Sequence, residues 1–246
     1  MSNQGAAEPP TARTAYDAWH CSQEVDIDVN TPWHRFIKKY IHPAQDLADR
    51  RILEIGCGRG GFSCWLASQQ PGPKEVVAAD FSQAAVKMGR AFAVERGLSN
   101  ITWKVADIQR IPFEAETFDT VISCETIEHV PDPRQAVQEL ARVLKPEGRL
   151  FLTTPNYLGV FGLYRIYRRL VGRRFTEIGQ PINKLVLLPL TLEWVRRTKL
   201  KVEIVDSVEL WPFPMRPPRA LRLPRILRSV RKWLGVQSFI VARKVN

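Results

Sequence analysis

A glycine-rich turn and a separate aspartate have the residue types and spacing to bind a nucleoside. The turn, LEIGCGRGGFS at residues 53–63, contains Gly56 and Gly58, where the missing side chain lets the backbone approach a ligand closely. Glu54 precedes these glycines and suits hydrogen bonding to a cationic amino group better than the cradling of a pyrophosphate. Asp80 lies 24 residues after Gly56, where it could accept both hydroxyls of a ribose. The turn alone is a weak signal, because glycine turns also serve dinucleotide enzymes and simple packing.

A second aspartate extends this pattern. Asp107 follows a predicted strand in the phrase VADIQRIPF, where its carboxylate could accept the amino group of an adenine. The alternative for this residue is an aspartate that only caps a turn. Together with the glycine turn, the two aspartates predict a pocket for an adenine nucleoside.

Predicted strands and helices alternate along the chain and would hold these residues at one edge of a sheet. Such alternation indicates parallel β-α-β units in a doubly wound α/β fold with helices on both faces. Ser82 is a plausible N-cap for the second of the helices that follow a strand. Strands are predicted at 51–55, 75–79, 101–105, 117–123, 148–154, 201–210 and 238–244, and helices at 32–40, 60–69, 82–96 and 133–144. The sheet is therefore expected to have seven strands and to be mostly parallel.

The order of these motifs resembles the class I S-adenosylmethionine-dependent methyltransferases. LEIGCGRGG, VVAADFS, VADIQRIPFEAETFDTVISCETIEHVPDP and ARVLKPEGRLFLTTPN follow one another between residues 51 and 156. They are most similar to the small-molecule branch that includes the ubiquinone-biosynthesis O-methyltransferases. The resemblance implies a Rossmann-like class I methyltransferase fold, S-adenosylmethionine as cofactor, and a methyl-transferring enzyme.

The resemblance also assigns cofactor contacts to particular residues. The glutamate and glycines of the turn would bind the methionine part, Asp80 the ribose, and Asp107 with Ile108 the adenine. Cys124 would line the pocket through its backbone, and Arg35 falls where this branch has an N-terminal arginine that reaches the cofactor carboxylate. The implied cofactor-binding residues are Arg35, Glu54, Gly56, Cys57, Gly58, Asp80, Phe81, Asp107, Ile108, Cys124 and Glu125.

Other enzyme classes fail on particular segments. A nicotinamide dehydrogenase would carry G-x-G-x-x-G, whereas this turn reads GCGRGG. DNA amino-methyltransferases have an Asn/Asp-Pro-Pro-aromatic motif after the fourth strand, where this chain has SCETIEH. The pair of glutamates typical of protein arginine methyltransferases is not visible.

His129, in CETIEHVPDP, is the best candidate for a general base. It follows the predicted strand at 117–123, at the switch-point edge where ligands bind, and a hydroxyl acceptor benefits from such a base. Two alternatives stay open: a structural histidine held by Glu125 or Glu128, or a divalent metal bound by all three side chains. Asn156 and Tyr157, beyond the fifth strand, would face the acceptor unless they form a simple turn.

The charge of the chain is unevenly distributed. Residues 158–246 hold 19 Lys and Arg against 5 Asp and Glu (+14), whereas residues 1–157 hold 17 against 20 (−3). Basic amphipathic helices are predicted at 158–171 and 224–234, and such helices are typical of membrane-surface enzymes. A solvated basic surface, or apolar stripes packed on the parent domain, would explain the same pattern.

These features favour O-methylation of a small or lipid-linked, anionic acceptor. A tRNA methyltransferase, which shares this scaffold and is basic, is the rival, and a noncatalytic cofactor-binding protein is a third class. The expected partners are therefore a small-molecule or lipid-linked acceptor and an anionic membrane surface, with nucleic acid less favoured.

The 246 residues, 45% of them apolar, suit one core. The interpretation is a flexible leader at 1–29 and a methyltransferase domain at 30–246, with basic helical insertions near 158–186 and 211–236. The leader has no apolar signal region, and the longest apolar stretch, 185–192, is far shorter than the ~20 residues that span a bilayer.

The cysteines indicate the cellular compartment that we expect for the protein. Four of them without a CxxC pair argue against zinc or a disulfide framework. A cytoplasmic protein is expected, at most peripheral on the membrane.

Overall fold

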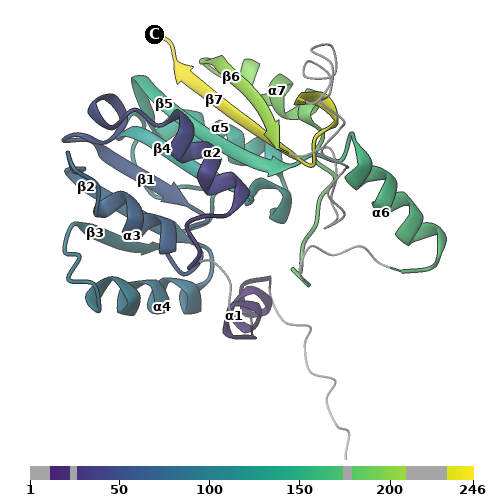
Figure 1. The fold of residues 1–246 in the computed structure, drawn as a ribbon, viewed down its shortest axis with the longest axis horizontal. Helices are drawn as coiled ribbons and strands as arrows, with labels where there is room; N and C mark the ends of the chain where they lie inside the picture. The colour runs from purple at the N-terminus through teal and green to yellow at the C-terminus, as the bar shows by residue number, and fades with distance from the viewer. Residues whose placement is uncertain (1–11, 23–26, 174–178, 209–231) are drawn as a thin grey trace, which may run out of the picture.

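Seven strands form one sheet in the order β3-β2-β1-β4-β5-β7-β6 in the computed structural model (Figure 1). The structure describes residues 12–22, 27–173, 179–208 and 232–246. Strand β7 runs antiparallel to both of its neighbours, and the other pairs are parallel. The strands are β1 (Arg51–Ile55), β2 (Glu75–Asp80), β3 (Ile101–Val105), β4 (Phe118–Cys124), β5 (Leu144–Pro155), β6 (Leu200–Val208) and β7 (Gln237–Lys244). The seven-stranded, mostly parallel α/β fold is confirmed.

Helices cover both faces of the sheet because alternate side chains of each strand point to opposite faces. Ile52 and Phe151 pack in one cluster with α2 and α3, whereas Leu53 and Leu150 pack in another with α5 and α7. Helix α4 extends the first layer over Trp103 of β3. The helices of the two layers are α2 (Pro32–Tyr40), α3 (Gly61–Ala67), α4 (Gln83–Val94), α5 (Pro133–Val143) and α7 (Leu188–Arg196).

The sheet order reverses between β1 and β4, which both lie at its centre. The connection from β1 goes outward to β2 and β3, and the chain then returns to β4 on the other side of β1. In open parallel sheets this reversal leaves a crevice at the carboxyl ends of the strands, where ligands bind. Glu54 near the end of β1, Asp80 at the end of β2 and Cys124 at the end of β4 therefore share one edge.

Three local predictions differ from the structure. Residues 12–22 of the expected leader form helix α1 (Ala12–Ser22), which is tied to the domain by long-range hydrogen bonds, so the interpretation as a flexible leader is wrong for these residues. Strand β5 begins at Leu144, because Leu144 pairs with Phe118 of β4 before an irregularity, after which the register resumes at Arg149. Helix α7 has no counterpart among the predicted helices.

The first basic helix forms, as α6 (Val160–Leu170). Most of the second, including Arg225, Arg228 and Arg231, lies outside the described residues, and only residues 232–234 of it are described, as a helical turn. Among the described residues, no helix has the length and apolar character needed to cross a membrane.

Replacing Ser82 by Ala should lower the free energy of unfolding by about 1 kcal/mol. Ser82 caps α4: its hydroxyl accepts from the Ala85 amide at 3.1 Å and donates to Asp17 of α1 at 2.6 Å. Urea unfolding followed by circular dichroism measures the change. Ser68→Ala is the matched control, because this exposed serine donates to the Trp65 carbonyl, accepts from its neighbour Gln69 at 3.5 Å, and caps no helix N-terminus. An equal loss in both variants would contradict the capping role.

Candidate active site

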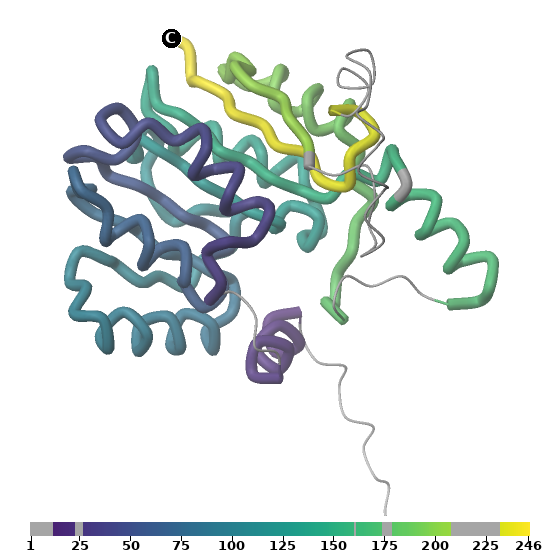
Figure 2. The backbone as a smooth tube through the Cα atoms, in the orientation of Figure 1, coloured from purple at the N-terminus to yellow at the C-terminus, as the bar shows by residue number. Residues whose placement is uncertain are grey.

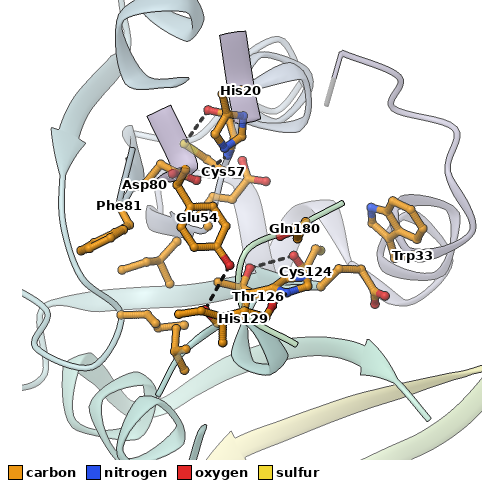
Figure 3. A pocket seen from close by; sticks show the side chains of 18 of the residues that line it. His20, Trp33, Glu54, Cys57, Asp80, Phe81, Cys124, Thr126, His129 and Gln180 are labelled. Atoms are coloured by element: carbon orange, nitrogen blue, oxygen red, sulfur yellow. Dashed lines mark hydrogen bonds between the residues drawn. The ribbon is translucent and has the colours of Figure 1, made fainter. Parts of the chain in front are cut away.

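A cavity of about 710 Å³ opens at the carboxyl edge of the sheet. Its lining comes from the turn after β1, the ends of β2 and β4, and the segment after β3, together with α1 and the start of α2. Figure 3 shows Glu54, Asp80 and His129 gathered around it, with His20 and Trp33 at its margins. All but one of the predicted cofactor-binding residues line this cavity.

The glycine turn is shaped by close approach of the chain to itself. Gly56 has φ +78°, and a Cβ added there would lie 2.1 Å from Thr126 Oγ1. A side chain at this position would therefore be strained and would collide with the loop after β4. Beside the turn, the buried carboxylate of Glu54 accepts a hydrogen bond from the Ser63 hydroxyl. A narrow backbone wall next to a buried carboxylate suits a ligand with a cationic amino group.

The two aspartates are held by backbone amides. Asp80 accepts from the Gly58 amide through Oδ2 and from the Ser82 amide through Oδ1, both at 2.8 Å, so it ties the glycine turn to the start of α4. Asp107 accepts from the Gln109 amide at 2.8 Å and thereby caps a local turn while it lines the cavity. Asp107 therefore both caps a local turn and lines the cavity. Ile108 beside it is buried and also lines the cavity.

Glu125 stands at the end of β4 in a left-handed backbone conformation, with φ +48°. Its Oε1 accepts from the Thr153 hydroxyl at 2.8 Å and its Oε2 from the Gln237 amide at 3.1 Å. Burial raises the pKa of Glu125 to about 7, and the two hydrogen bonds act in the opposite direction. Because a strained backbone at a ligand cavity is typical of functional positions, this residue fits the pocket assignment.

The imidazole of His129 has a protein atom opposite each ring nitrogen. Nδ1 lies 2.7 Å from the Ile182 carbonyl, so it carries the proton, and Nε2 lies 3.5 Å from Oε1 of the fully buried Glu128. Burial lowers the pKa of His129 to about 4, against the effect of the Ile182 hydrogen bond. The neutral ring therefore has its lone pair on Nε2, and the Glu128 carboxylate lies next to this nitrogen.

Comparison with known proteins identifies the family. Residues 53–152 match a sequence profile described as a methyltransferase domain. The chain is 31% identical over 178 residues to a ubiquinone biosynthesis O-methyltransferase of Xanthomonas euvesicatoria, across 71% of this chain and 72% of that protein. The chain belongs to the class I S-adenosylmethionine-dependent methyltransferases. A Coxiella burnetii protein of the same name is 33% identical over 118 residues, or 48% of this chain and 49% of its own length.

Solved structures show the same fold. A putative methyltransferase of Haloferax volcanii, solved with a methyltransferase activator, has a TM-score of 0.66 at 18% identity and covers 96% of this chain and 98% of its own. An S-adenosylmethionine-dependent methyltransferase of Mesorhizobium loti has a TM-score of 0.61 at 17% identity, over 87% of this chain and 99% of that one. These structures show the fold, and the matches to the methyltransferase domain and to the O-methyltransferase relative show that the chain is a methyltransferase enzyme with S-adenosylmethionine as its cofactor.

Arg35 is the one predicted cofactor contact of this methyltransferase that does not reach the cavity. It lies exposed on α2, whereas its neighbours Trp33 and His34 line the cavity. Successive helical residues differ by about 100° in direction, so the face that brings Trp33 and His34 inward turns Arg35 to solvent. His34 is fixed there by stacking on Phe62, with ring centroids 4.4 Å apart. The assignment of Arg35 to the cofactor carboxylate is wrong in this structure.

Asn156 and Tyr157 do not line the cavity either. Asn156 is fully buried and donates through Nδ2 to the Trp233 carbonyl at 2.7 Å, and Tyr157 is buried beneath α6. The cavity wall comes instead from Pro155 and Phe161 on either side of them. The alternative of a structural turn after β5 holds for both residues.

The three side chains considered for a metal do not form a ligand set. Glu125 turns to Thr153 and Gln237, whereas Glu128 accepts from the Thr154 hydroxyl at 3.0 Å and faces His129. Within the described residues, no group of three or more His, Cys, Asp or Glu side chains is arranged to hold a metal ion.

Helix α1 contributes cavity residues that the sequence pattern did not reveal. Tyr16, Trp19 and His20 all line the cavity, and the Tyr16 hydroxyl donates to the His129 carbonyl at 3.2 Å. Their spacing of i, i+3 and i+4 marks one helix face and was the available signal. The segment 179–187 is the other addition: Figure 2 shows it descending towards α1, and Gln180 and Ile182 reach the cavity.

Changing Glu125 to Gln should alter the pH dependence of stability. The folded state holds the Glu125 proton up to about pH 7, against an ordinary value of 4.5, so its contribution to stability is present at low pH and is lost as the pH rises through 7. From pH 4 to pH 8, Glu125→Gln should gain roughly 1–2 kcal/mol relative to the wild type, less than the full shift because the side chain borders the cavity. Urea unfolding at both pH values measures it.

Glu139→Gln is the control for this effect because its slope should have the opposite sign. Burial opposes the change, but hydrogen bonds from Arg142 and from the Ile111 amide lower the pKa of Glu139. Its contribution is therefore present at high pH and is lost as the pH falls, so Glu139→Gln should lose stability relative to the wild type between pH 4 and pH 8. Parallel slopes in both variants would refute the raised pKa of Glu125.

Proposed function

We propose that this methyltransferase transfers a methyl group to a hydroxyl of a small acceptor that has an apolar body, bound beside His129. The observation that carries the proposal is the mixed lining of one cavity. This lining includes the glycine turn, Asp80 and Asp107, and it also includes His129 together with a set of apolar side chains. These apolar residues are Val130, Pro131, Pro155, Phe161, Ile182 and Val236.

The polar part of the cavity fits S-adenosylmethionine. At Gly56 the absence of a Cβ lets Thr126 pack against the turn, and both residues line the cavity. We assign the buried carboxylate of Glu54 to the amino group, Asp80 to the ribose hydroxyls, and Asp107 with Ile108 to the adenine; all four residues line the cavity. When bound, S-adenosylmethionine supplies an electrophilic methyl group on a sulfonium.

In the proposed reaction the residues of the chain position the acceptor and remove its proton. Bound S-adenosylmethionine would supply the methyl group to the acceptor oxygen and leave as its neutral thioether, while the hydroxyl proton would pass to Nε2 of His129. Glu128, 3.5 Å from Nε2, stabilises the imidazolium that results. This step requires the Glu128–His129 contact to open towards the acceptor as it binds.

The relatives support the choice of a hydroxyl acceptor. Those named above are O-methyltransferases of ubiquinone biosynthesis, and O-methylation joins a methyl group to a hydroxyl oxygen. A hydroxylated aromatic ring with an apolar chain suits the apolar wall around His129. We therefore place the acceptor of this enzyme in that chemical class.

Methyl transfer from isotope-labelled S-adenosylmethionine tests the proposal. The purified enzyme is incubated with catechols that carry no chain, a short alkyl chain or a long alkyl chain, and products are identified by mass spectrometry. We expect a methyl ether, with kcat/KM rising with chain length. Label that enters tRNA in preference to any hydroxylated ring would favour the nucleic-acid rival. Cofactor binding without turnover on any substrate of the set or on RNA would favour a noncatalytic role.

A further inference from the structure

Helix α6 turns its apolar face to solvent, whereas a helix that packs on its own domain buries that face. Leu163, Ile166, Tyr167 and Leu170 follow one another at helical spacing and form one stripe, named here the α6 patch. Their exposed fractions are 67%, 57%, 58% and 80%. Single exposed apolar residues are normal, but a continuous stripe on one helix marks an interaction surface.

The opposite side of α6 uses polar groups to hold the helix on the domain. Arg165 donates to the Asn183 carbonyl at 3.2 Å, and its guanidinium lies over the Tyr157 ring at 5.0 Å. Phe161, also on this side, stacks on the Tyr157 ring with centroids 5.4 Å apart. Figure 1 shows the helix projecting at the edge of the molecule, with only its first turn near the sheet. The outward direction of the α6 patch is therefore fixed by contacts, not by a loose attachment.

Cationic side chains border the apolar stripe. Arg169 and Arg173 are exposed at the end of α6, and Val171 beside them is 48% exposed. Near the start of the helix, Trp233 and Leu234 are 37% and 38% exposed, and the Leu234 carbonyl lies against Gly159. An apolar centre with arginines at its border and a nearby tryptophan is the arrangement of a helix that lies in a membrane interface.

Other occupants fit these residues less well. A symmetric contact with a second copy whose α6 runs parallel would bring Arg169 and Arg173 of both copies together, which like-charge repulsion opposes. Nucleic acid binds through cationic side chains along its phosphates, but large apolar side chains occupy the centre of the α6 patch. An anionic lipid surface meets both features, because acyl chains accept the stripe and head groups accept the arginines.

We propose that the α6 patch docks this methyltransferase onto an anionic phospholipid surface. The docked helix starts at the cavity, since Phe161 in its first turn is part of the cavity lining and stacks on Tyr157. An apolar acceptor dissolved in the lipid would then reach the cavity without crossing water. This delivery role rests on the proposed function, whereas docking itself does not.

Vesicle flotation of the full chain tests the docking. The wild type should float with vesicles of phosphatidylglycerol and phosphatidylcholine and much less with phosphatidylcholine alone. Leu163→Gln/Ile166→Gln/Leu170→Gln should lower partitioning to both by at least about tenfold. Arg169→Gln/Arg173→Gln should lower partitioning to the anionic vesicles by about tenfold or more at low salt, with little change on neutral ones.

Matched substitutions on α4 provide the control. Val94 is 72% exposed, and Lys87 and Arg90 are exposed cations on the same helix, away from α6. Val94→Gln and Lys87→Gln/Arg90→Gln should float as the wild type does. All of these variants change exposed side chains, so their thermal unfolding should match that of the wild type.

Several results would overturn the docking. They are a wild type that ignores anionic vesicles, an α6-patch variant that floats as well as the wild type, a dimer in solution that the α6-patch variant abolishes, or tight RNA binding that the α6-patch variant abolishes. Methylation of a water-soluble catechol without vesicles separates this failure from that of the proposed function. If the wild type methylates the catechol but does not float, only the docking proposal is refuted. If it floats but methylates no hydroxyl, only the proposed function is refuted.

Discussion

Replacing His129 by Ala is expected to lower kcat by about 10²–10⁴-fold at saturating S-adenosylmethionine, with little change in cofactor affinity. The proposed base is the Nε2 atom of a neutral ring whose Nδ1 proton is held by the Ile182 carbonyl. Removing the ring leaves Glu54 and Asp80, the proposed cofactor contacts, in place. Single-turnover methylation with labelled cofactor measures the chemical step, and calorimetry measures cofactor binding.

The pH profile gives a second reading of the same residue. Because burial lowers the pKa of His129 to about 4, the ring stays neutral above about pH 5 and should cause no acid-side loss of rate between pH 8 and pH 6. His42→Ala is the matched control, since His42 is exposed and is not part of the cavity lining. Turnover of His129→Ala within about threefold of the wild type would rule out general base catalysis by this histidine.

The second expected result concerns Asp80. Asp80→Ala should weaken S-adenosylmethionine binding by roughly 1.5–3 kcal/mol, which is tenfold or more in Kd. The variant loses the carboxylate placed for the ribose hydroxyls, and it also frees the Gly58 and Ser82 amides that this carboxylate holds at 2.8 Å. Calorimetry with S-adenosylmethionine and with its demethylated product measures the change.

Two comparisons separate ligand contact from loss of structure. Asp132→Asn is the matched control, because this exposed aspartate caps α5, is not itself part of the cavity lining, and Asn is an equally good cap. Thermal unfolding of Asp80→Ala without cofactor reports how far the glycine turn depends on the carboxylate. Unchanged cofactor affinity in Asp80→Ala would contradict the assignment of this residue.

The sheet and the polar part of the cavity could be predicted from the sequence because their signals are local. Buried strands, glycine turns and the helices between them are encoded within a few residues, so β1 to β4 were placed to within one or two residues. In a parallel sheet the carboxyl ends of neighbouring strands share an edge, and this rule brings Glu54, Asp80 and Asp107 together once the strands are known.

Contacts between distant segments decided the rest. Helix α1 looked like part of a leader because the hydrogen bonds that tie it to the domain reach residues more than 60 positions away. They join Asp17 to Ser82 and Tyr16 to His129. The pattern of α2 could not show that Arg35 would face solvent, since the inward face depends on what packs against the helix.

The same reason explains the acceptor side and the α6 patch. The sequence by itself determined that a histidine follows β4 and that α6 is basic and amphipathic. Only the tertiary structure decided that His129 lies between Ile182 and Glu128 and that the apolar stripe of α6 points outward. A side chain's direction is fixed by the segments that pack around it, and those segments are far away along the chain.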